Sequence, residues 1–359
     1  MRTLPTLLLV AAQLLLTLGT SPLRAAEPAL SDTGRWPAEK AWTWYGQHPW
    51  LVGCNFVPST AVNDIEMWQK ESFDPATIDR ELGWAQDLGF NTVRIFLNEV
   101  VWESDPEGLK QRLGQFLEIA DRHHLSSLVI LFDDCFGPTP QIGKQPDPVP
   151  RVHNSRWVQS PGAARRDNPA AWPKLEQYVK DVVGRFGSDK RVLAWEVYNE
   201  PTQSLPLVEA AFQWAREAKP DQPLTATVFG TPAMEARIKD LSDVISFHNY
   251  RTLPELKADV ARLQPVQRPL LCTEWMARPH ASLFETHLPY FKAQNIACWN
   301  WGLVAGRIQT YYGWGKPGTE DEPPLWFHDI LRHDGTPYLA SEAAVIRYAT
   351  GVSKTAPPH

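Results

Sequence analysis

Residues 193–201 read Leu-Ala-Trp-Glu-Val-Tyr-Asn-Glu-Pro, an apolar run that ends in a polar pair and a proline. Such a run is typical of a buried parallel strand, and Pro201 ends it because proline cannot donate to the hydrogen-bond ladder. Glu200 is thereby expected at the carboxyl end of a strand, where barrel enzymes carry their catalytic side chains. A lone glutamate there is more often a solvated carboxylate, so a functional role requires a second carboxylate in an equivalent position.

The same pattern recurs along the chain: a short apolar or β-branched run, a polar turn, and an amphipathic helical segment. Strands are predicted at residues 51–56, 92–97, 127–133, 192–198, 224–228, 244–248, 269–274 and 296–301. Helices are predicted at residues 74–88, 109–123, 172–186, 205–218, 253–263, 283–293 and 341–349. Eight strands that alternate with helices over about 250 residues predict an α/β fold, a single (β/α)8 TIM barrel.

Two connections are longer than the others, residues 134–170 after the third predicted strand and residues 302–338 after the eighth. Both leave from the edge that carries Glu200, so we expect these long loops to wall a cleft. An open doubly wound sheet would instead require a G-x-G-x-x-G turn early in the chain, and that motif does not occur there.

Residues 1–26 have a basic start at Arg2, a Leu-rich apolar run and small residues up to Ala26, the pattern of a secretory signal peptide. The run is too short for a convincing transmembrane helix, and no cysteine follows it for lipid attachment. We therefore expect a secreted or periplasmic protein without a membrane anchor. The expected organisation is a signal peptide over 1–26, a barrel domain over 27–352 and a C-terminal tail over 353–359.

Composition narrows the class of ligand. The net charge of -6 is small and dispersed, so no nucleic-acid partner is expected. The protein is expected to be a monomer. The four cysteines form no C-x-x-C zinc motif and lie in or beside apolar runs, which leaves one disulfide open; they are Cys54, Cys135, Cys272 and Cys298. The 16 tryptophans, many near predicted turns, favour flat apolar platforms on which sugar rings stack.

The second carboxylate is Glu274, which ends the seventh predicted strand and precedes Trp275. Three βα units separate it from Glu200, so the two carboxylates should face each other across the mouth of the barrel. Such a pair is what glycosidic bond cleavage requires. A separation of about 5 Å would allow nucleophilic attack and retention, whereas a wider gap admits a water and gives inversion.

In combination these motifs resemble the retaining glycoside hydrolases of the large (β/α)8 clan that includes glycoside hydrolase family 5. Asn199 and Glu200 are similar to the Asn-Glu pair of the clan's fourth strand, which implies that Glu200 is the general acid/base and that Asn199 binds the sugar 2-hydroxyl. Glu274 matches the nucleophile of the seventh strand. The resemblance implies that residues 27–352 form a glycoside hydrolase catalytic domain.

Further residues match the clan at other strand ends. Arg94 resembles the arginine that keeps the nucleophile ionised. In the sixth strand, His248 and Tyr250 match a His-x-Tyr motif in which the histidine contacts substrate and the tyrosine hydrogen-bonds the nucleophile. Either Trp299 or Trp301 would form the platform beneath the sugar that precedes the cleaved bond.

Elementary electrostatics predicts the roles of the two carboxylates. A cation and a phenol near Glu274 would stabilise its charged form, whereas desolvation and a facing carboxylate would raise the pKa of Glu200. Glu196 shares strand parity with Glu200, so it should point inward below the site as a buried hydrogen-bonding partner.

The chain also departs from the clan. Where many members carry a histidine after the third strand, this chain has Asp133 and Asp134, either of which could bind a sugar hydroxyl or cap the following loop. Asn55, after the first strand, could also point into the mouth. The long loops hold aromatic residues that could stack on sugars or pack the loops: Trp157, Tyr311, Tyr312, Trp314 and Trp326.

The sequence therefore predicts a retaining hydrolase of a β-linked polysaccharide or oligosaccharide, of β-1,4-mannan, glucan or xylan type, that needs no cofactor and no metal. One alternative is a non-catalytic glycan-binding barrel, although both glutamates are present. A second is a metal-dependent barrel hydrolase that uses His248, Asp133 and Asp134, although the chain lacks an early His-x-His motif.

Overall fold

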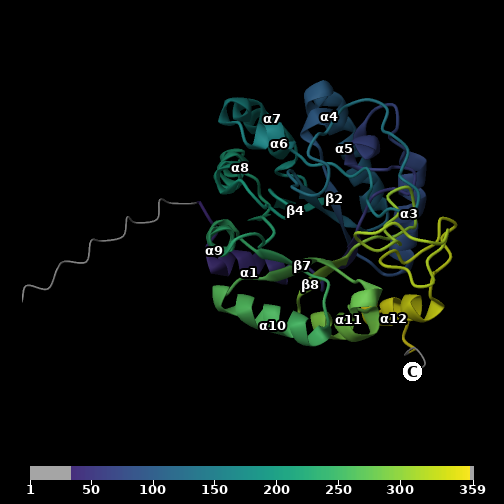
Figure 1. Cartoon of the computed structure of the whole chain (residues 1–359). Coiled ribbons are helices and arrows are strands. Elements are labelled where there is room, and N and C mark those ends of the chain that lie inside the picture. Colours follow the sequence, from purple (N-terminus) through teal and green to yellow (C-terminus); the bar gives the residue numbers. More distant parts are fainter. Residues whose placement is uncertain (1–33, 356–359) are drawn as a thin grey trace, which may run out of the picture. The chain divides into compact units, whose positions relative to one another are not determined.

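The computed structural model describes residues 34–355. Its strands form one parallel sheet in the order β5-β4-β3-β2-β1-β8-β7-β6 (Figure 1). They are β1 (Val52–Asn55), β2 (Thr92–Phe96), β3 (Ser126–Ile130), β4 (Val192–Glu196), β5 (Leu224–Thr225), β6 (Ile245–Asn249), β7 (Leu270–Trp275) and β8 (Ala297–Asn300). All eight predicted strands are confirmed, and with them the barrel. The predicted signal peptide and residues 356–359 of the predicted tail lie outside the described residues.

The two ends of the sheet meet, which closes the barrel. A parallel bridge joins Thr227, just after β5, to Ser246 of β6. The backbone N–H of Val228 donates to the carbonyl of Ser246 at 2.8 Å, and the hydroxyl of Thr225 donates to the carbonyl of Val244 at 2.8 Å. The predicted strand over 224–228 is thus shorter than expected, because its second half pairs only through this bridge.

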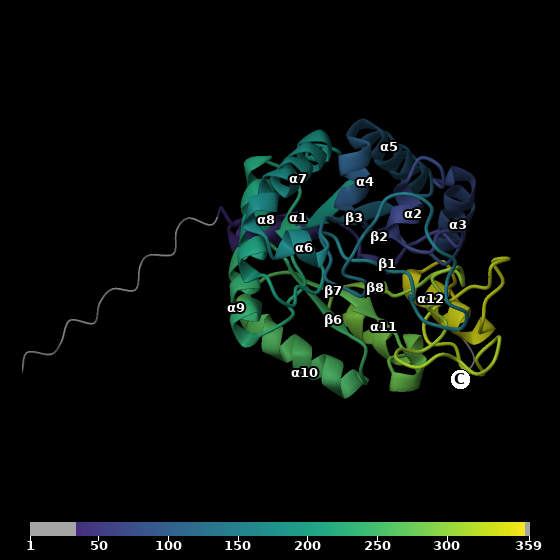
Figure 2. The same cartoon turned by 45° about the horizontal axis from the view of Figure 1, so that its top comes forward.

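Helices surround the strands (Figure 2). The larger ones are α1 (Ala38–Gly46), α3 (Pro75–Asp87), α5 (Pro106–Arg122), α7 (Trp172–Phe186), α8 (Leu205–Glu217), α9 (Pro232–Leu241), α10 (Leu253–Leu263), α11 (Phe284–Ala293) and α12 (Ala340–Thr350). Short helices α2 (Asp64–Trp68), α4 (Glu99–Ser104) and α6 (Ala163–Arg166) lie in the connections. The seven predicted helices are confirmed; α1, α9 and the short helices were not predicted. Within residues 34–355, no helix combines the length and apolarity needed to cross a bilayer.

Local sequence explains these elements. Side chains of Asp74 and Asp105 cap α3 and α5 by accepting backbone N–H bonds, and a proline follows each cap, where its missing N–H is harmless. Helix α7 buries an apolar stripe at helical spacing: Leu175, Tyr178, Val179, Val182, Val183 and Phe186. Every residue of β2, β4 and β7 is buried, as expected for parallel strands covered on both faces.

The cysteines do not pair. All four lie within the described residues as free thiols, so the disulfide left open by the sequence does not form. Three are buried in strands, whereas Cys135 is partly exposed in the loop after β3. That loop and the loop after β8 are the long connections predicted from the sequence, and both border the site described next.

Candidate active site

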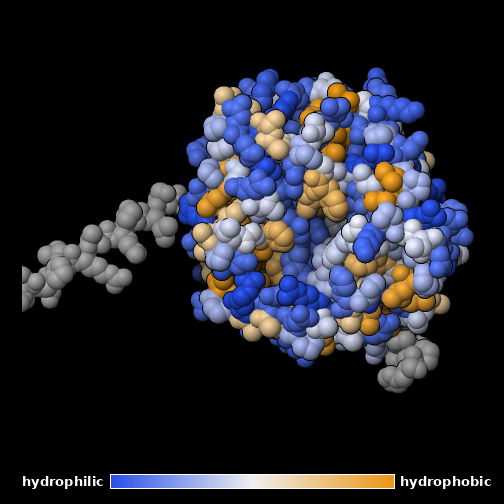
Figure 3. Space-filling view, in the orientation of Figure 1, coloured by the Kyte–Doolittle hydropathy of each residue, from blue (hydrophilic) through white to orange (hydrophobic). Residues whose placement is uncertain are grey.

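A pocket of about 700 Å³ lies at the carboxyl ends of the strands. The face drawn in Figure 3 is hollowed near its centre. Eight of the twelve predicted site residues line the pocket: Asp133, Asn199, Glu200, His248, Tyr250, Glu274, Trp301 and Trp314. The other four, Arg94, Asn55, Asp134 and Trp299, lie outside its lining.

Glu200 and Glu274 come together from β4 and β7. One carboxylate oxygen of each lies within 4.8 Å of the other. Glu200 has a φ of 40°, in the left-handed region that non-glycine residues seldom occupy. Such backbone strain is concentrated at functional sites. Two carboxyl groups this close leave no room for a water on a direct line between them.

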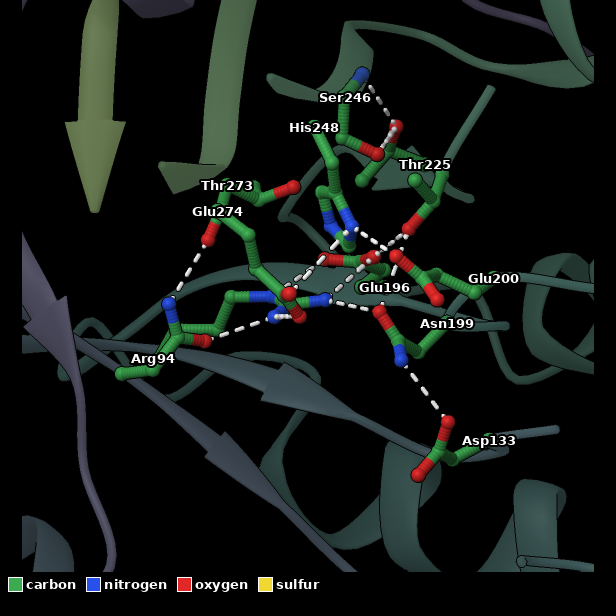
Figure 4. A network of polar contacts seen from close by, with 12 residues as sticks. Arg94, Asp133, Glu196, Asn199, Glu200, Thr225, Ser246, His248, Thr273 and Glu274 are labelled. Atoms are coloured by element: carbon green, nitrogen blue, oxygen red, sulfur yellow. Dashed lines mark hydrogen bonds and ion pairs between the residues drawn. The ribbon is translucent and has the colours of Figure 1, made fainter. Parts of the chain in front are cut away.

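Arg94 lies at the bottom of the site. It is fully buried, and its Nη1 donates to Glu274 Oε1 at 2.7 Å (Figure 4). Its Nε and Nη2 donate to the two oxygens of Glu196, each at 2.9 Å, a bidentate pair of the stronger kind. The buried role predicted for Glu196 is confirmed, since its side chain is fully covered and bonded to Arg94 and Thr227.

Two asparagines complete the shell of Arg94. Nη1 and Nη2 of Arg94 donate to Oδ1 of Asn55 at 2.7 Å and to Oδ1 of Asn199 at 2.6 Å. Because Arg94 has no acceptor, these bonds fix which way each amide points. Nδ2 of Asn55 donates to the carbonyl of Thr273 at 2.9 Å, below the pocket. Asn199 instead lines the pocket.

His248 and Tyr250, from the end of β6, bond to the two glutamates. The hydroxyl of Tyr250 donates to Glu274 Oε2 at 2.7 Å, which is the contact predicted from the sequence. Nδ1 of His248 lies 2.6 Å from Glu200 Oε1 and 3.5 Å from Glu274 Oε2. His248 therefore lies between the carboxylates, whereas the sequence predicted only a contact with substrate.

This position of His248 changes the pKa direction expected for Glu200. Burial raises the pKa of Glu274, and the charges of His248 and Arg94 only partly oppose it. Burial also acts to raise the pKa of Glu200, but the hydrogen bond and charge of His248 outweigh it and hold that pKa below its usual value. Burial lowers the pKa of His248, and the two carboxylates outweigh it, so its pKa is raised. The predicted stabilisation of charged Glu274 by Arg94 and Tyr250 is confirmed, because both lower its pKa, although burial outweighs them. The predicted rise in the pKa of Glu200 is wrong for the ligand-free site because the prediction left out the His248–Glu200 bond.

Asp133 lies beside Asn199 at the pocket wall. Its oxygens accept from Asn199 Nδ2 at 2.8 Å and from Trp157 Nε1 at 2.7 Å. Burial raises its pKa to about 7, against the effect of these hydrogen bonds. Asp133 therefore orients Asn199 and Trp157, whose side chains line the pocket on either side of Asp133.

Asp134 points away from the pocket. Its carboxylate accepts from the Tyr198 hydroxyl at 2.8 Å, from the Thr202 backbone at 2.9 Å and from Arg166 at 3.3 Å. The sequence left open whether Asp134 binds a sugar hydroxyl or caps the following loop. These contacts match the second role, because they fix the loops. A metal site that combines Asp134 with His248 would require this network to be broken.

The two tryptophans at the end of β8 lie in different surroundings, one in the pocket and one in the core. Trp301 lines the pocket, whereas Trp299 is fully buried in the barrel core. Trp301 packs edge-on against Phe96 and Trp157, with ring centroids 5.6 and 6.0 Å away. Trp314 lines the mouth and is 45% exposed. The other loop aromatics, Tyr311, Tyr312 and Trp326, are absent from the pocket lining and pack on one another.

Several pocket residues were not predicted. Sγ of Cys135 lies 3.3 Å from Glu200 Oε2, and the long loops add Phe136, His153, Asn154 and His328 to the lining. No local motif marks these residues, because their position depends on how two long loops fold against each other. The departures from the clan at Asp133 and Asp134, next to Cys135 and Phe136, were the only signal available in the sequence.

One group of side chains in residues 34–355 has ligand atoms close enough to hold a metal ion, namely Glu200, His248 and Glu274. The same atoms already bond to protein donors: His248 to Glu200, and Arg94 and Tyr250 to Glu274. The Arg94 cation beside Glu274 opposes a second positive charge there. The geometry fits a hydrogen-bonded carboxylate pair better than a metal centre.

No protein-family model and no curated protein sequence matches the chain. Solved structures do match it. GH5_18 from Streptomyces cattleya, in complex with GlcNAc, has a TM-score of 0.56 and 14% identity over 86% of this chain and 82% of that chain. A glycoside hydrolase family 5 mannosidase from Rhizomucor miehei has a TM-score of 0.57 and 14% identity over 83% of this chain and 92% of that chain.

A hyperthermostable endo-1,4-β-D-mannanase from Thermotoga petrophila also matches, with a TM-score of 0.53 and 14% identity over 84% of this chain and 99% of that chain. At such identities the similarity concerns the fold. The chain thus has the (β/α)8 fold of glycoside hydrolase family 5 enzymes, as its motifs predicted.

Proposed function

We propose that this protein is a retaining glycoside hydrolase that cleaves β-mannosidic bonds, with Glu200 as acid/base and Glu274 as nucleophile. The observation that carries the proposal is the separation of less than 4.8 Å between oxygens of the two carboxylates. Retaining enzymes hold their carboxyl groups about 5–5.5 Å apart, whereas inverting enzymes need about 6.5–9.5 Å to admit a water.

In the first step, an oxygen of Glu274 attacks the anomeric carbon while the bond to the leaving oxygen breaks. Arg94 and Tyr250 each bond one oxygen of Glu274 and so orient it for attack. Glu200 gives a proton to the leaving oxygen. Because the pKa of Glu200 is low and that of His248 is high, this proton rests on Nδ1 of His248, 2.6 Å from Glu200, until the leaving oxygen draws it across.

In the second step, Glu200 removes a proton from water, and the water oxygen attacks the anomeric carbon of the glycosyl ester. The ester bond breaks, and Glu274 regains its negative charge beside Arg94. Two inversions at the same carbon give net retention of configuration. The protein's own groups supply acid, base and nucleophile, so the proposed reaction requires no cofactor.

The choice of β-mannosides rests on the structural neighbours, which include a mannosidase and an endo-mannanase. A neutral sugar also suits the Trp301 platform and the amide of Asn199 in the pocket lining. Glucosides and xylosides, which the sequence alone does not separate from mannosides, are the comparison substrates. We also propose that the protein is exported, on the basis of the signal-peptide pattern in residues 1–26.

The test uses 4-nitrophenyl β-mannoside, β-glucoside and β-xyloside with the wild type, Glu200→Ala and Glu274→Ala. We expect the wild type to cleave the mannoside fastest and to keep its activity in chelator. With azide and an activated aryl mannoside, Glu200→Ala should form the β-mannosyl azide and Glu274→Ala the α-mannosyl azide. A wild type that binds mannosides without cleaving them would favour the glycan-binding barrel, and activity lost in chelator would favour a metal enzyme.

A further inference from the structure

The loops after β3 and β8 are joined into one wall. The backbone N–H of Asn154 donates to the carbonyl of Ile308 at 2.9 Å, and that of Gly318 donates to the carbonyl of Arg151 at 2.8 Å. The side chain of Gln309 accepts from the Arg151 backbone at 2.8 Å and donates to the carbonyl of Val149 at 2.8 Å. The two loops therefore act as one continuous barrier at the mouth of the barrel.

The sheet order shows what this wall covers. Strands β3, β2, β1 and β8 are consecutive neighbours, so a bridge between the β3 and β8 loops passes over β2 and β1. The pocket residues on the side of β5 and β6 include Arg251 and Arg262, whose side chains are 72% and 44% exposed. The loop after β8 also extends over the end of β7, since Trp314 packs on His280 and on Tyr250 with ring centroids 5.4 and 5.0 Å away. The pocket is thus closed from β3 through β2, β1 and β8 to β7, and open on the side of β4 to β6.

The two glutamates lie at the border of these halves and have contacts on both sides: Tyr250 after β6 donates to Glu274, and Cys135 after β3 lies 3.3 Å from Glu200. Glu274, the proposed nucleophile, bonds to Arg94 of β2 under the closed half. Glu200, the proposed acid, bonds to His248 of β6 in the open half. The closed half contains Trp301, the platform of the proposed function, so the sugar that is attacked is assigned to this half and the leaving group to the open half beside Arg251 and Arg262.

The closed half contains buried polar atoms without hydrogen-bond partners. They are Nε2 of His328, Oδ1 of Asn154 and Nε1 of Trp301, and these residues are 1%, 3% and 6% exposed. All three residues line the pocket. Buried polar groups in proteins are nearly always hydrogen-bonded, so such a set within one pocket indicates groups that a ligand satisfies.

The polarity of these atoms specifies the ligand. Nδ1 of His328 lies 2.6 Å from the carbonyl of Met276 and donates to it, which leaves a lone pair on Nε2. Burial lowers the pKa of His328, so the ring is neutral. His153 is arranged in the same way, with Nδ1 on the carbonyl of Tyr312 and a pKa lowered by burial to about 4. Among these pocket atoms, lone pairs outnumber N–H groups. This arrangement favours sugar hydroxyls, which can donate to the lone pairs, and repels a carboxylate.

We propose that the walled half of the pocket binds one uncharged, chain-terminal sugar through His328, Asn154 and Trp301, so that the enzyme removes single sugars from the non-reducing end. This inference rests on the proposed function and makes it specific. An endo-acting enzyme needs a cleft open on both sides of the cleaved bond. In the proposed arrangement the joined loops stand where further sugars beyond the attacked one would lie.

The direct test measures the products that the enzyme forms from mannohexaose labelled at its reducing end. We expect mannose as the sole unlabelled product at early times, with labelled chains that shorten one unit at a time. Internal fragments at early times, formed by an enzyme that also cleaves aryl β-mannoside, would overturn the inference and leave the proposed function intact. No cleavage of either substrate would overturn the proposed function itself.

A second test examines recognition of hydroxyls. Asn154 has a φ of 47°, which glycine also adopts, so Asn154→Gly removes Oδ1 and keeps the backbone. We expect kcat/KM for aryl β-mannoside to fall about tenfold, the loss of one hydrogen bond, with an unchanged pH profile. Asn295→Gly is the matched control, because Asn295 has a φ of 50°, is exposed and is absent from the pocket lining.

Discrimination between neutral and charged sugars can be tested with the wild type alone. The wild type should cleave 4-nitrophenyl β-mannuronide about a hundredfold more slowly than the mannoside, because the closed half offers a carboxylate few donors. Comparable rates for the two substrates, or equal losses in Asn154→Gly and Asn295→Gly, would contradict the proposed recognition.

Discussion

Nδ1 of His248 lies 2.6 Å from Oε1 of Glu200, and the same atom lies 3.5 Å from Oε2 of Glu274. His248 thereby links the two carboxylates into one titrating cluster. In the proposed mechanism its imidazole holds the proton that Glu200 delivers to the leaving oxygen. The pH dependence of the enzyme should therefore report on the cluster and not on an isolated glutamic acid.

The pH profile follows from the directions of the pKa shifts. The pKa of Glu274 is raised, so its nucleophilic form should be lost as the pH falls through a value above the ordinary 4.5. The pKa of His248 is also raised, so the proton needed by Glu200 should persist to a pH above 6.5. We expect a bell-shaped dependence of kcat/KM with limbs above these two values.

The variant His248→Gln removes the imidazole that holds the proton for Glu200 in the proposed mechanism. We expect the alkaline limb to move to lower pH, and cleavage of mannobiose to fall about a hundredfold, within the range for general acid catalysis. An activated dinitrophenyl mannoside needs little protonation, so its first step should be affected much less. Equal losses on both substrates, with an unmoved alkaline limb, would show that His248 only binds the sugar.

Arg94 is expected to be essential for both stability and activity. Arg94→Met leaves the fully covered Glu196 side chain without its cation, and breaking a buried pair in this way costs about 3–5 kcal/mol in the free energy of unfolding. The double variant Arg94→Met with Glu196→Gln should recover part of that stability but none of the activity, because Glu274 still lacks its partner. Chemical denaturation and kcat measured in parallel separate the two effects. Recovery of activity in the double variant would show that Arg94 acts only through the fold.

Cys135 should make the enzyme sensitive to thiol reagents. It is the one partly exposed cysteine of the four, and its Sγ lies 3.3 Å from Glu200 Oε2. Burial raises its pKa, so alkylation should be slow at neutral pH and faster as the pH rises. We expect iodoacetamide to abolish activity and a mannoside ligand to protect it.

Cys135→Ala serves as the control for alkylation. Its residual activity should be the same before and after iodoacetamide, because the other three cysteines are buried in strands. Peptide mapping of the treated wild type should locate the label at Cys135. Inactivation of Cys135→Ala at the wild-type rate would exclude this explanation.

The neighbouring tryptophans of β8 and its loop provide a matched pair. Trp301→Ala removes the pocket platform, and we expect kcat/KM to fall about tenfold or more. Trp299→Ala leaves a cavity in the core, and we expect about 3–5 kcal/mol less stability. Kinetics measured well below the melting temperature, together with thermal melts, should show opposite patterns for the two variants. Equal kinetic losses would mean that Trp299 also determines the shape of the pocket.

Much of the fold was predictable because barrels repeat one local pattern. Each strand is a short apolar run, and helices such as α7 carry a stripe with helical period. Helix α9 was missed because its apolar stripe is short, with three buried residues in Pro232–Leu241. The short extent of β5 was missed because hydrogen-bond pairing depends on neighbouring strands and not on local composition.

The candidate site was predictable where a residue ends a strand. Glu200, Glu274, Tyr250 and Asn199 were found this way, and the structure brings all four to one pocket. Residues on the long loops were not predictable, because contacts such as Asn154 to Ile308 join positions far apart in sequence. The predicted pKa direction of Glu200 failed for a similar reason, since it depends on which carboxylate His248 contacts.

The central claim is that Glu200 and Glu274 act by double displacement, and the anomer released first tests it most directly. Proton NMR can follow hydrolysis of an aryl β-mannoside by the wild type before mutarotation scrambles the product. Because the carboxylate oxygens lie within 4.8 Å, we expect the β anomer of the free sugar to appear first. Initial release of the α anomer would mean inversion and would contradict the assignment of Glu274 as nucleophile.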